Sequence, residues 1–294
     1  MTESQLSHAA AAPGAIRLHP TRWIVDLLYY AVLIVLALVM LIPFAWMLST
    51  SLKPTEYILS VTPQFIPNPA TLDSYRTLFD LMPMQRMLGN SLFVAIAGAG
   101  GQVLVSAMAA YAFARIEWRG REIVFLLYLG TMMVPSQVTL IPLFILIRQL
   151  GWVNSYQGLI LPGLFSAFGT FLLRQAFLSL PRDLEEAAFI DGANHLTIFW
   201  RIILPLTRPA LATLAVLSFM QYWNAYLWPL FVARQEIFMT LPVGLAKLQG
   251  GPRALTQWNV VMAGAVVTVL PILIAYLFAQ KWFVRSVTLS GIKG

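Results

Sequence analysis

Six long apolar segments, separated by more polar stretches, dominate the hydrophobic pattern of the chain. They are residues 27–47, 91–113, 123–147, 156–173, 209–233 and 260–280. Each is close to the roughly 20 residues that an α-helix needs to cross a bilayer. In lipid, helices satisfy every backbone N–H and C=O group internally. The pattern therefore predicts an all-α membrane protein with six transmembrane helices, of which the third is interrupted by Pro135 and Pro142.

Composition supports a membrane protein over a water-soluble one. The chain has 294 residues, of which 59% are hydrophobic and 11% are charged, whereas soluble domains average roughly 25% charged residues. So few polar side chains cannot cover a surface that faces water. There is no Cys and there are three scattered His residues, so we expect no disulfide, no metal site and no catalytic residue.

The distribution of Lys and Arg predicts the orientation. If the N-terminus is cytoplasmic, twelve of the 19 Lys and Arg residues fall in inner segments and seven in outer ones. The positive-inside rule then places both termini in the cytoplasm. We expect a cytoplasmic N-terminal segment (1–26), a transmembrane domain (27–284) and a cytoplasmic tail (285–294). The net charge of +7 suits contact with anionic lipid, and no basic patch with interleaved aromatics points to nucleic acid.

Two of the predicted outer segments are long. Residues 49–90 and 234–257 are rich in Pro or Gly, which is typical of loops and short helices. They are either simple connectors or a docking surface for an external partner.

Glycines in the second apolar segment have two possible meanings. Gly98, Gly100 and Gly101 resemble a phosphate-binding loop superficially, but they lie in an apolar segment and no Lys-Ser or Lys-Thr follows them. Small residues at such spacing allow close helix packing in lipid. We therefore expect helix packing and no phosphate-binding loop at these glycines.

The loop before the fifth segment, residues 181–205, predicts two short helices joined by a sharp turn. Asp183 is a candidate N-cap, with Glu186 completing a capping box, for a helix over 184–190. Gly192 can adopt the left-handed backbone that ends such a helix. Asn194 can cap a second helix over 196–203.

The surface of this predicted pair of helices suits a protein partner. Ala187 and Ala188 allow close approach, Phe189 and Ile190 offer apolar side chains, and Glu185, Glu186 and Asp191 offer negative charge. The alternative is a helix lying at the lipid headgroups. Such a helix is normally rich in Lys and Arg, but this one has only Arg182 near its start.

This loop resembles the EAA loop of ABC importer permeases. That pattern is Glu-Ala-Ala, three residues, Gly, nine residues, Ile, one residue and Leu-Pro, and it is matched at every defined position by Glu186-Ala187-Ala188, Gly192, Ile202 and Leu204-Pro205. Asp191-Gly192-Ala193, Trp223-Asn224, Asn90-Ser91-Leu92 and the terminal Ile292-Lys293-Gly294 resemble the carbohydrate branch, in particular the permeases of maltose importers. Ser286 departs from that branch, which tends to have Gly there.

The resemblance implies a type I importer permease fold in a bacterial inner (cytoplasmic) membrane. It implies pairing with a second homologous permease subunit, two ATPase subunits that bind ATP and Mg, and an extracytoplasmic sugar-binding protein facing residues 238–251. No cofactor is expected in this chain, and it is not an enzyme. The resemblance assigns ATPase coupling to the EAA loop residues Glu185, Glu186, Ala187, Ala188, Phe189, Asp191, Gly192, Ile202, Leu204 and Pro205, and a second ATPase contact to the tail.

Polar and aromatic residues in the spans are candidates for a sugar path. They are Gln137, Gln221, Tyr222, Trp223, Asn224 and Trp228. Amides beside aromatic rings suit an uncharged sugar. The alternative is that these side chains bind neighbouring helices.

Three other functions remain open at this point. An ion-coupled carrier without an ATPase would usually place charged residues inside its spans, and here the charges lie at span ends or in loops. A membrane-embedded enzyme would need a nucleophile and a base within a span. An ABC permease for a glycerol phosphate is the third, and the sequence does not identify the cargo.

Overall fold

The computed structural model describes residues 20–58, 64–249 and 257–290, with side chains described as far as Leu277. The chain divides into two compact units, Met1–Trp46 and Met47–Gly294. In the described ranges all regular secondary structure is helical.

The first unit consists, in its described part, of helix α1 (Pro20–Ser51), whose last residues belong to the second unit. Its membrane-length stretch is Val25–Ser51. Apolar side chains are exposed on every side of this helix, as on a helix that crosses lipid. The predicted first span is confirmed and is longer at both ends.

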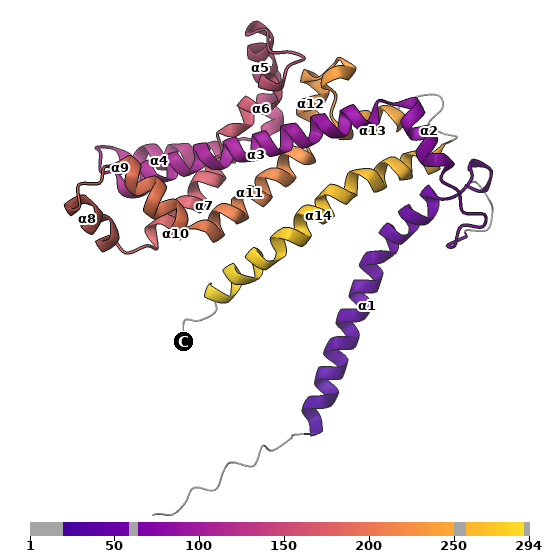
Figure 1. Ribbon diagram of the computed structural model, residues 1–294, viewed down its shortest axis with the longest axis horizontal. Coiled ribbons are helices and arrows are strands. Elements are labelled where there is room, and N and C mark those ends of the chain that lie inside the picture. The colour runs from indigo at the N-terminus through magenta and orange to yellow at the C-terminus, as the bar shows by residue number, and fades with distance from the viewer. Residues whose placement is uncertain (1–19, 59–63, 250–256, 291–294) are drawn as a thin grey trace, which may run out of the picture. The chain divides into compact units, whose positions relative to one another are not determined.

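Helix α3 (Met84–Arg115) is the central element of the second unit. It packs against α7 (Ala167–Leu178) and α11 (Arg208–Trp223), as Figure 1 shows. A Cβ added at Gly98 would lie 2.6 Å from the Tyr222 ring, and one at Gly101 would lie 2.7 Å from Leu164. Gly98 and Gly101 therefore serve close packing, as predicted, whereas for Gly100 the prediction is wrong, because an added Cβ there would meet no atom within 4 Å.

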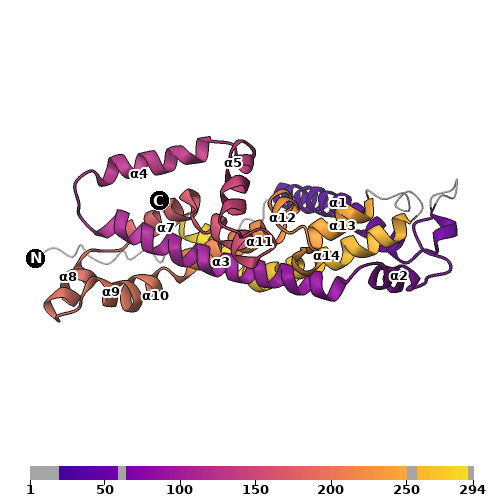
Figure 2. The same ribbon diagram turned by 90° about the horizontal axis from the view of Figure 1, so that it is seen from above.

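The third apolar segment is two helices with a sharp bend between them. Helices α4 (Arg121–Gly130) and α5 (Ser136–Gln149) flank a 3₁₀ turn, and the two halves are bent by 100°, as Figure 2 shows. The bend lies at Val134, whose backbone is extended because the ring of the following proline disfavours helical geometry. The expectation that Pro142 also breaks this segment is wrong, since α5 continues through it.

The fourth and fifth segments are also interrupted. Helix α6 (Tyr156–Ile160) and a 3₁₀ turn precede α7 with a bend of 47°. Helix α11 ends at Trp223, and α12 (Leu227–Val232) completes the fifth segment. The sixth is α14 (Trp258–Ser290). By length and composition, three described helices are able to span a membrane, or up to six elements if each bent pair is one span. The third such pair is residues 195–206 with α11, bent by 82°, and it does not include α12.

Short helices form the two ends of the second unit. One end has α2 (Asp73–Leu81) and α13 (Leu241–Gln249), and the other has α8 (Asp183–Ile190), α9 (His195–Ile198) and α10 (Leu204–Leu206). Figure 1 shows these groups beside opposite ends of α3. Single 3₁₀ turns lie at Thr55–Tyr57 and Glu236–Phe238.

Each end of α3 has its own hydrophobic core. Leu78, Met87 and Leu241 belong to one, and Ala110, Phe177 and Ile198 belong to the other. The second core places residues 181–205 directly against α3 and α7, and so positions the first candidate site.

Candidate functional site: residues 181–205 and an uncharged cavity

Residues 181–205 form the predicted helix, turn and helix, but the start of the first helix differs from the prediction. Helix α8 begins at Asp183, and the residue before it, Arg182, has helical backbone angles and no capping side chain. The predicted capping box of Asp183 and Glu186 is therefore absent. Three acidic residues lie in the first turn instead, where negative charge is favourable for the helix dipole.

Gly192 ends α8 as predicted. Its φ is +82°, a conformation that costs other residues roughly 1–2 kcal/mol. The Gly192 N–H donates to Phe189 O (3.0 Å), and the Ala193 N–H donates to Ala188 O (2.9 Å). These two bonds form a Schellman motif and fix the direction in which the chain leaves the helix.

The second helix is shorter than predicted. Asn194 caps it as expected, since its Oδ1 accepts from the Thr197 N–H at 2.8 Å. Helix α9 ends at Ile198, however, and Phe199–Ile203 is a π-helical turn. Pro205 lacks an N–H and its ring crowds the carbonyl of Arg201, which explains the widened turn.

Arg115 joins three elements at the inner end of α3. Its Nη2 donates to the carbonyls of Phe177 and Leu180 (the latter at 2.9 Å), and its Nε lies 2.9 Å from Oε1 of Glu185. The two side chains are only 3% and 10% exposed. The interpretation of Glu185 as charge offered to a partner is wrong, because its carboxylate faces the interior and pairs with Arg115.

Burial raises the pKa of Glu185, while Arg115, Arg182 and His195 pull the pKa of this carboxyl in the opposite direction. Because the net shift of the Glu185 pKa is upward, the attraction of nearby cations does not fully offset the cost of removing the carboxylate from water, as is common for buried ion pairs. The pair therefore fixes the position of α8 on α3 more than it adds stability.

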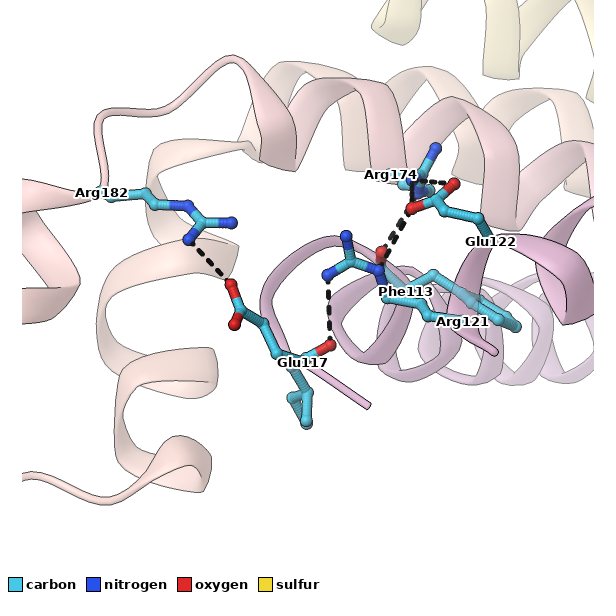
Figure 3. A network of polar contacts seen from close by, with 7 residues as sticks. Phe113, Glu117, Arg121, Glu122, Arg174 and Arg182 are labelled. Carbon is cyan, nitrogen blue, oxygen red and sulfur yellow. Dashed lines mark hydrogen bonds and ion pairs between the residues drawn. The ribbon is translucent and has the colours of Figure 1, made fainter. Parts of the chain in front are cut away.

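A second, more exposed network connects the same elements. Arg174 donates to both carboxylate oxygens of Glu122 (2.8 and 3.0 Å) and to the Phe113 carbonyl (3.2 Å). Arg182 pairs with Glu117 at 3.3 Å. Figure 3 shows these side chains pointing toward one another across α4, α7 and the segment that enters α8. The start of the third span is thus joined to the fourth.

Residues 181–205 have an inner and an outer side. Ala188, Ile202 and Leu204 pack against the second core, and Pro205 is half-buried. Glu186, Ala187, Asp191 and Gly192 are exposed. Phe189 is 42% exposed with its ring against His195, and Ile190 is 86% exposed. The outer side is a small apolar surface with acidic residues on it.

A cavity of about 460 Å³ lies between α5, α11, α12 and the turn before α7. Four of the six candidates for the sugar path line it, namely Gln137, Gln221, Tyr222 and Trp228. Trp223 does not, because it is buried and its Nε1 donates to Thr268 O (3.1 Å). Asn224 is exposed outside the lining. For these two the structure corrects the prediction.

Two asparagines that the sequence did not mark as site residues bind the backbone of residues 234–239, in the predicted outer segment 234–257. Asn90 Nδ2 donates to Ile237 O and Met239 O, both at 2.9 Å. Asn154 Oδ1 accepts from the Arg234 and Gln235 N–H groups, and Asn154 has a φ of +54°. The available signals were the position of Asn90 at the start of an apolar segment and its place in the Asn90-Ser91-Leu92 triplet.

Other predictions fall partly outside the described structure. Residues 250–251 of the expected binding-protein surface and the side chains of the tail, 285–294, lie outside the described residues, although the backbone of α14 reaches Ser290. In the described part, no group of three His, Asp or Glu residues is placed to hold a metal ion.

Comparison with known families gives a match over residues 102–289 to the model described as "Binding-protein-dependent transport system inner membrane component". The chain is 36% identical over 262 residues to the arabinooligosaccharides transport system permease protein AraQ of Halalkalibacterium halodurans, a match that covers 88% of this chain and 93% of the relative. It is 35% identical over 268 residues to the sn-glycerol-3-phosphate transport system permease protein UgpE of Yersinia enterocolitica, covering 89% and 95%.

A third relative is the polygalacturonan/rhamnogalacturonan transport system permease protein YtcP of Bacillus subtilis, 32% identical, covering 92% of this chain and 98% of that one. Among solved structures, a bacterial ABC transporter involved in the import of the acidic polysaccharide alginate contains a chain with a TM-score of 0.79 and 28% identity, and the match covers 92% of this chain and 100% of that one.

Proposed function

The chain belongs to the family of binding-protein-dependent transport system inner membrane components, and from this premise we propose how it couples ATP hydrolysis to sugar movement. It is a permease subunit of an ABC importer of the carbohydrate group and not an enzyme. We place it in a bacterial cytoplasmic membrane as a multi-pass protein with both termini in the cytoplasm, since that orientation follows the positive-inside rule.

The outer side of residues 181–205, which we call the coupling segment, is the proposed contact with a separate ATPase subunit. Ile190 supports this most directly, because an isoleucine that is 86% exposed at the end of an acidic helix is an unfavourable side chain for a surface that meets only water. Fully burying it in a groove contributes roughly 1.5–3 kcal/mol. Glu186 and Asp191 beside it suit a basic rim on the partner.

Movement of the ATPase then reaches the spans through bonded contacts. Gly192 fixes the direction of the chain between α8 and α9, and Arg115 ties α8 to α3 and α7. ATP bound by the partner shifts this permease between states only if the ATPase binds those states with different affinity. In this proposal two ATPase subunits bind ATP and Mg²⁺, and this chain provides the surface that an ATPase subunit contacts.

Two further partners complete the proposed assembly. A second, homologous permease subunit covers part of the exposed apolar surface of the spans. An extracytoplasmic sugar-binding protein docks on the outer segment that Asn90 and Asn154 hold. A bacterial alginate ABC transporter solved in complex with an alginate pentasaccharide-bound periplasmic protein fits such an arrangement on the same fold (TM-score 0.62, 18% identity).

The proposal is tested by placing a charge on each of two equally exposed isoleucines. Ile190→Asp should abolish co-purification of the ATPase with the membrane-inserted permease. Ile66→Asp is the matched control, because Ile66 is 82% exposed and lies in the predicted outer segment. Equal recovery of the ATPase with both variants would contradict the proposed contact.

Orientation has its own test, which uses the absence of Cys from the chain. In cells that lack the ATPase, so that its groove does not cover position 190, Ile190→Cys should react with a membrane-impermeant maleimide only after the cells are opened, and Ile66→Cys should react in cells whose inner membrane is intact. Reaction of Ile190→Cys in intact cells would overturn the proposed topology.

A further inference from the structure

We infer that the 460 Å³ cavity takes an uncharged saccharide unit and rejects carboxylate and phosphate esters, an inference that rests on the proposed function. Its volume lies within the range of about 300–1,000 Å³ that is usual for small-molecule sites. It therefore suits a short saccharide or one part of a longer chain.

The lining of the cavity has no ionised group. None of the residues around it in the described structure is Asp, Glu, Lys, Arg or His. The other hollows described on this chain differ, since one has Glu117, Arg121 and Glu122 in its lining and another has Arg148 and Arg234. None of these charged residues lines the cavity.

Two aromatic rings form fixed walls. The Trp228 Nε1–H donates to Gly158 O at 2.9 Å, and the Tyr222 hydroxyl donates to Ile160 O at 3.0 Å. Both polar ends are therefore bonded to the backbone around α6, and the rings are held in position. At Gly163 an added Cβ would lie 2.5 Å from the Tyr222 hydroxyl oxygen, so a residue without a side chain is needed for this ring to fit.

The groups left for a ligand are neutral and can both donate and accept. The Gln221 amide and the Tyr226 hydroxyl have no hydrogen-bond partner among the described residues, and the Gln137 amide has only a long contact (3.5 Å) with Ser136. Amides and hydroxyls match the hydroxyl groups of a sugar, each of which is donor and acceptor. Flat apolar walls with a few such groups are typical of small-molecule sites.

One feature of the lining favours an anion, but the free energy it contributes is too small to reverse the inference. The first turn of α5, including Ser136 and Gln137, borders the cavity. A helix N-terminus stabilises a negative charge by roughly 0.3–1 kcal/mol. Removing a carboxylate or phosphate from water costs several kcal/mol, and no cation in the described lining offsets it. The cavity thus matches the cargo named for AraQ better than those named for UgpE and YtcP.

The test measures ligand binding to the complete permease–ATPase assembly in nanodiscs by saturation-transfer NMR. The probes are arabinotriose, trigalacturonate and glycerol 3-phosphate. Arabinotriose should bind and the two anions should not. Gln221→Lys should weaken arabinotriose binding about tenfold, as expected for losing a matched amide, and should create binding of trigalacturonate. Gln149→Lys makes the same change on an exposed residue outside the lining and should alter neither.

Binding of either anion to the unaltered assembly as strong as that of arabinotriose would overturn the inference, as would failure of all three probes to bind or equal behaviour of the two lysine variants. Recovery of the ATPase is scored in the same preparations. Loss of the ATPase from the unaltered assembly would refute the proposed function, whereas a coupled assembly with a cavity of the wrong selectivity would refute only this inference.

Discussion

Removing the carboxylate of Glu185 should loosen the whole coupling segment from the spans. In Glu185→Ala the Arg115 Nε remains buried, with its side chain 3% exposed, and loses its charged partner. Breaking one side of a buried ion pair costs about 3–5 kcal/mol. Arg115 keeps its bonds to the Phe177 and Leu180 carbonyls, so the lower value of about 3 kcal/mol applies, which is more than a hundredfold in the equilibrium for local opening.

The assay is hydrogen–deuterium exchange of residues 183–206 in the assembled importer, together with sugar uptake per ATP hydrolysed. Exchange should accelerate by at least about a hundredfold at the most protected amides, and uptake per ATP should fall. Glu117→Ala is the matched control. It breaks the pair between Glu117 and Arg182, whose side chains are 77% and 56% exposed respectively. Such surface pairs contribute about 0–1 kcal/mol.

An Arg115→Lys variant separates charge from geometry. Lysine retains the positive charge, but its single ammonium group cannot reproduce the planar guanidinium, which donates to two carbonyls and forms an ion pair with Glu185. It should resemble Glu185→Ala in the exchange experiment. Equal exchange in the Glu185→Ala and Glu117→Ala proteins, or unchanged behaviour of Arg115→Lys, would refute the reasoning that this pair fixes the coupling helix.

Three further predictions concern single positions. At Gly192 an added Cβ meets no atom within 4 Å, so Gly192→Ala should cost about 1 kcal/mol through its φ alone, and Gly192→Asn should cost less because Asn tolerates that conformation; thermal unfolding that ranks them in reverse would contradict this. Asn90→Ala should leave the Ile237 and Met239 carbonyls without their donor, at a cost of about 1–3 kcal/mol, and should make residues 236–249 more sensitive to protease while ATPase recovery is unchanged. Gly163→Ala should displace the Tyr222 ring, destabilise the fold by roughly 1–3 kcal/mol through overpacking, and so lower the melting temperature. Gly100→Ala, whose added Cβ meets no atom within 4 Å, should leave the melting temperature unchanged.

Helical segments could be predicted from the sequence because their signal is local. Each of the six apolar stretches coincides with described helices, and Pro135 marked the bend in the third. The break after Trp223 was missed, although the polar residue Asn224 lies there, because a single amide in an apolar segment does not by itself end a helix. The π-turn before Pro205 was missed because a proline predicts a disturbance without specifying its geometry.

Side-chain roles were harder to predict, because they depend on residues far away in the chain. Glu185 and Glu186 are adjacent acids, yet a helix turns by about 100° between them, so one meets Arg115 and the other meets solvent. Arg115 lies 70 positions before Glu185, and nothing local identifies it as the partner. Tyr222 and Trp223 differ in the same way, since only the first faces the cavity.

Helix α3 carries bonds to the outer segment and to the coupling segment on one continuous 32-residue rod. Ser91 Oγ accepts from the Leu241 N–H at 2.7 Å near one end, and Arg115 pairs with Glu185 at the other. The two attachment points are separated by about 36 Å at 1.5 Å per residue. A rigid tilt of about 5° around the midpoint moves each end by about 1.6 Å in opposite directions, so the binding protein and the ATPase proposed for the two ends would be mechanically linked through this one helix.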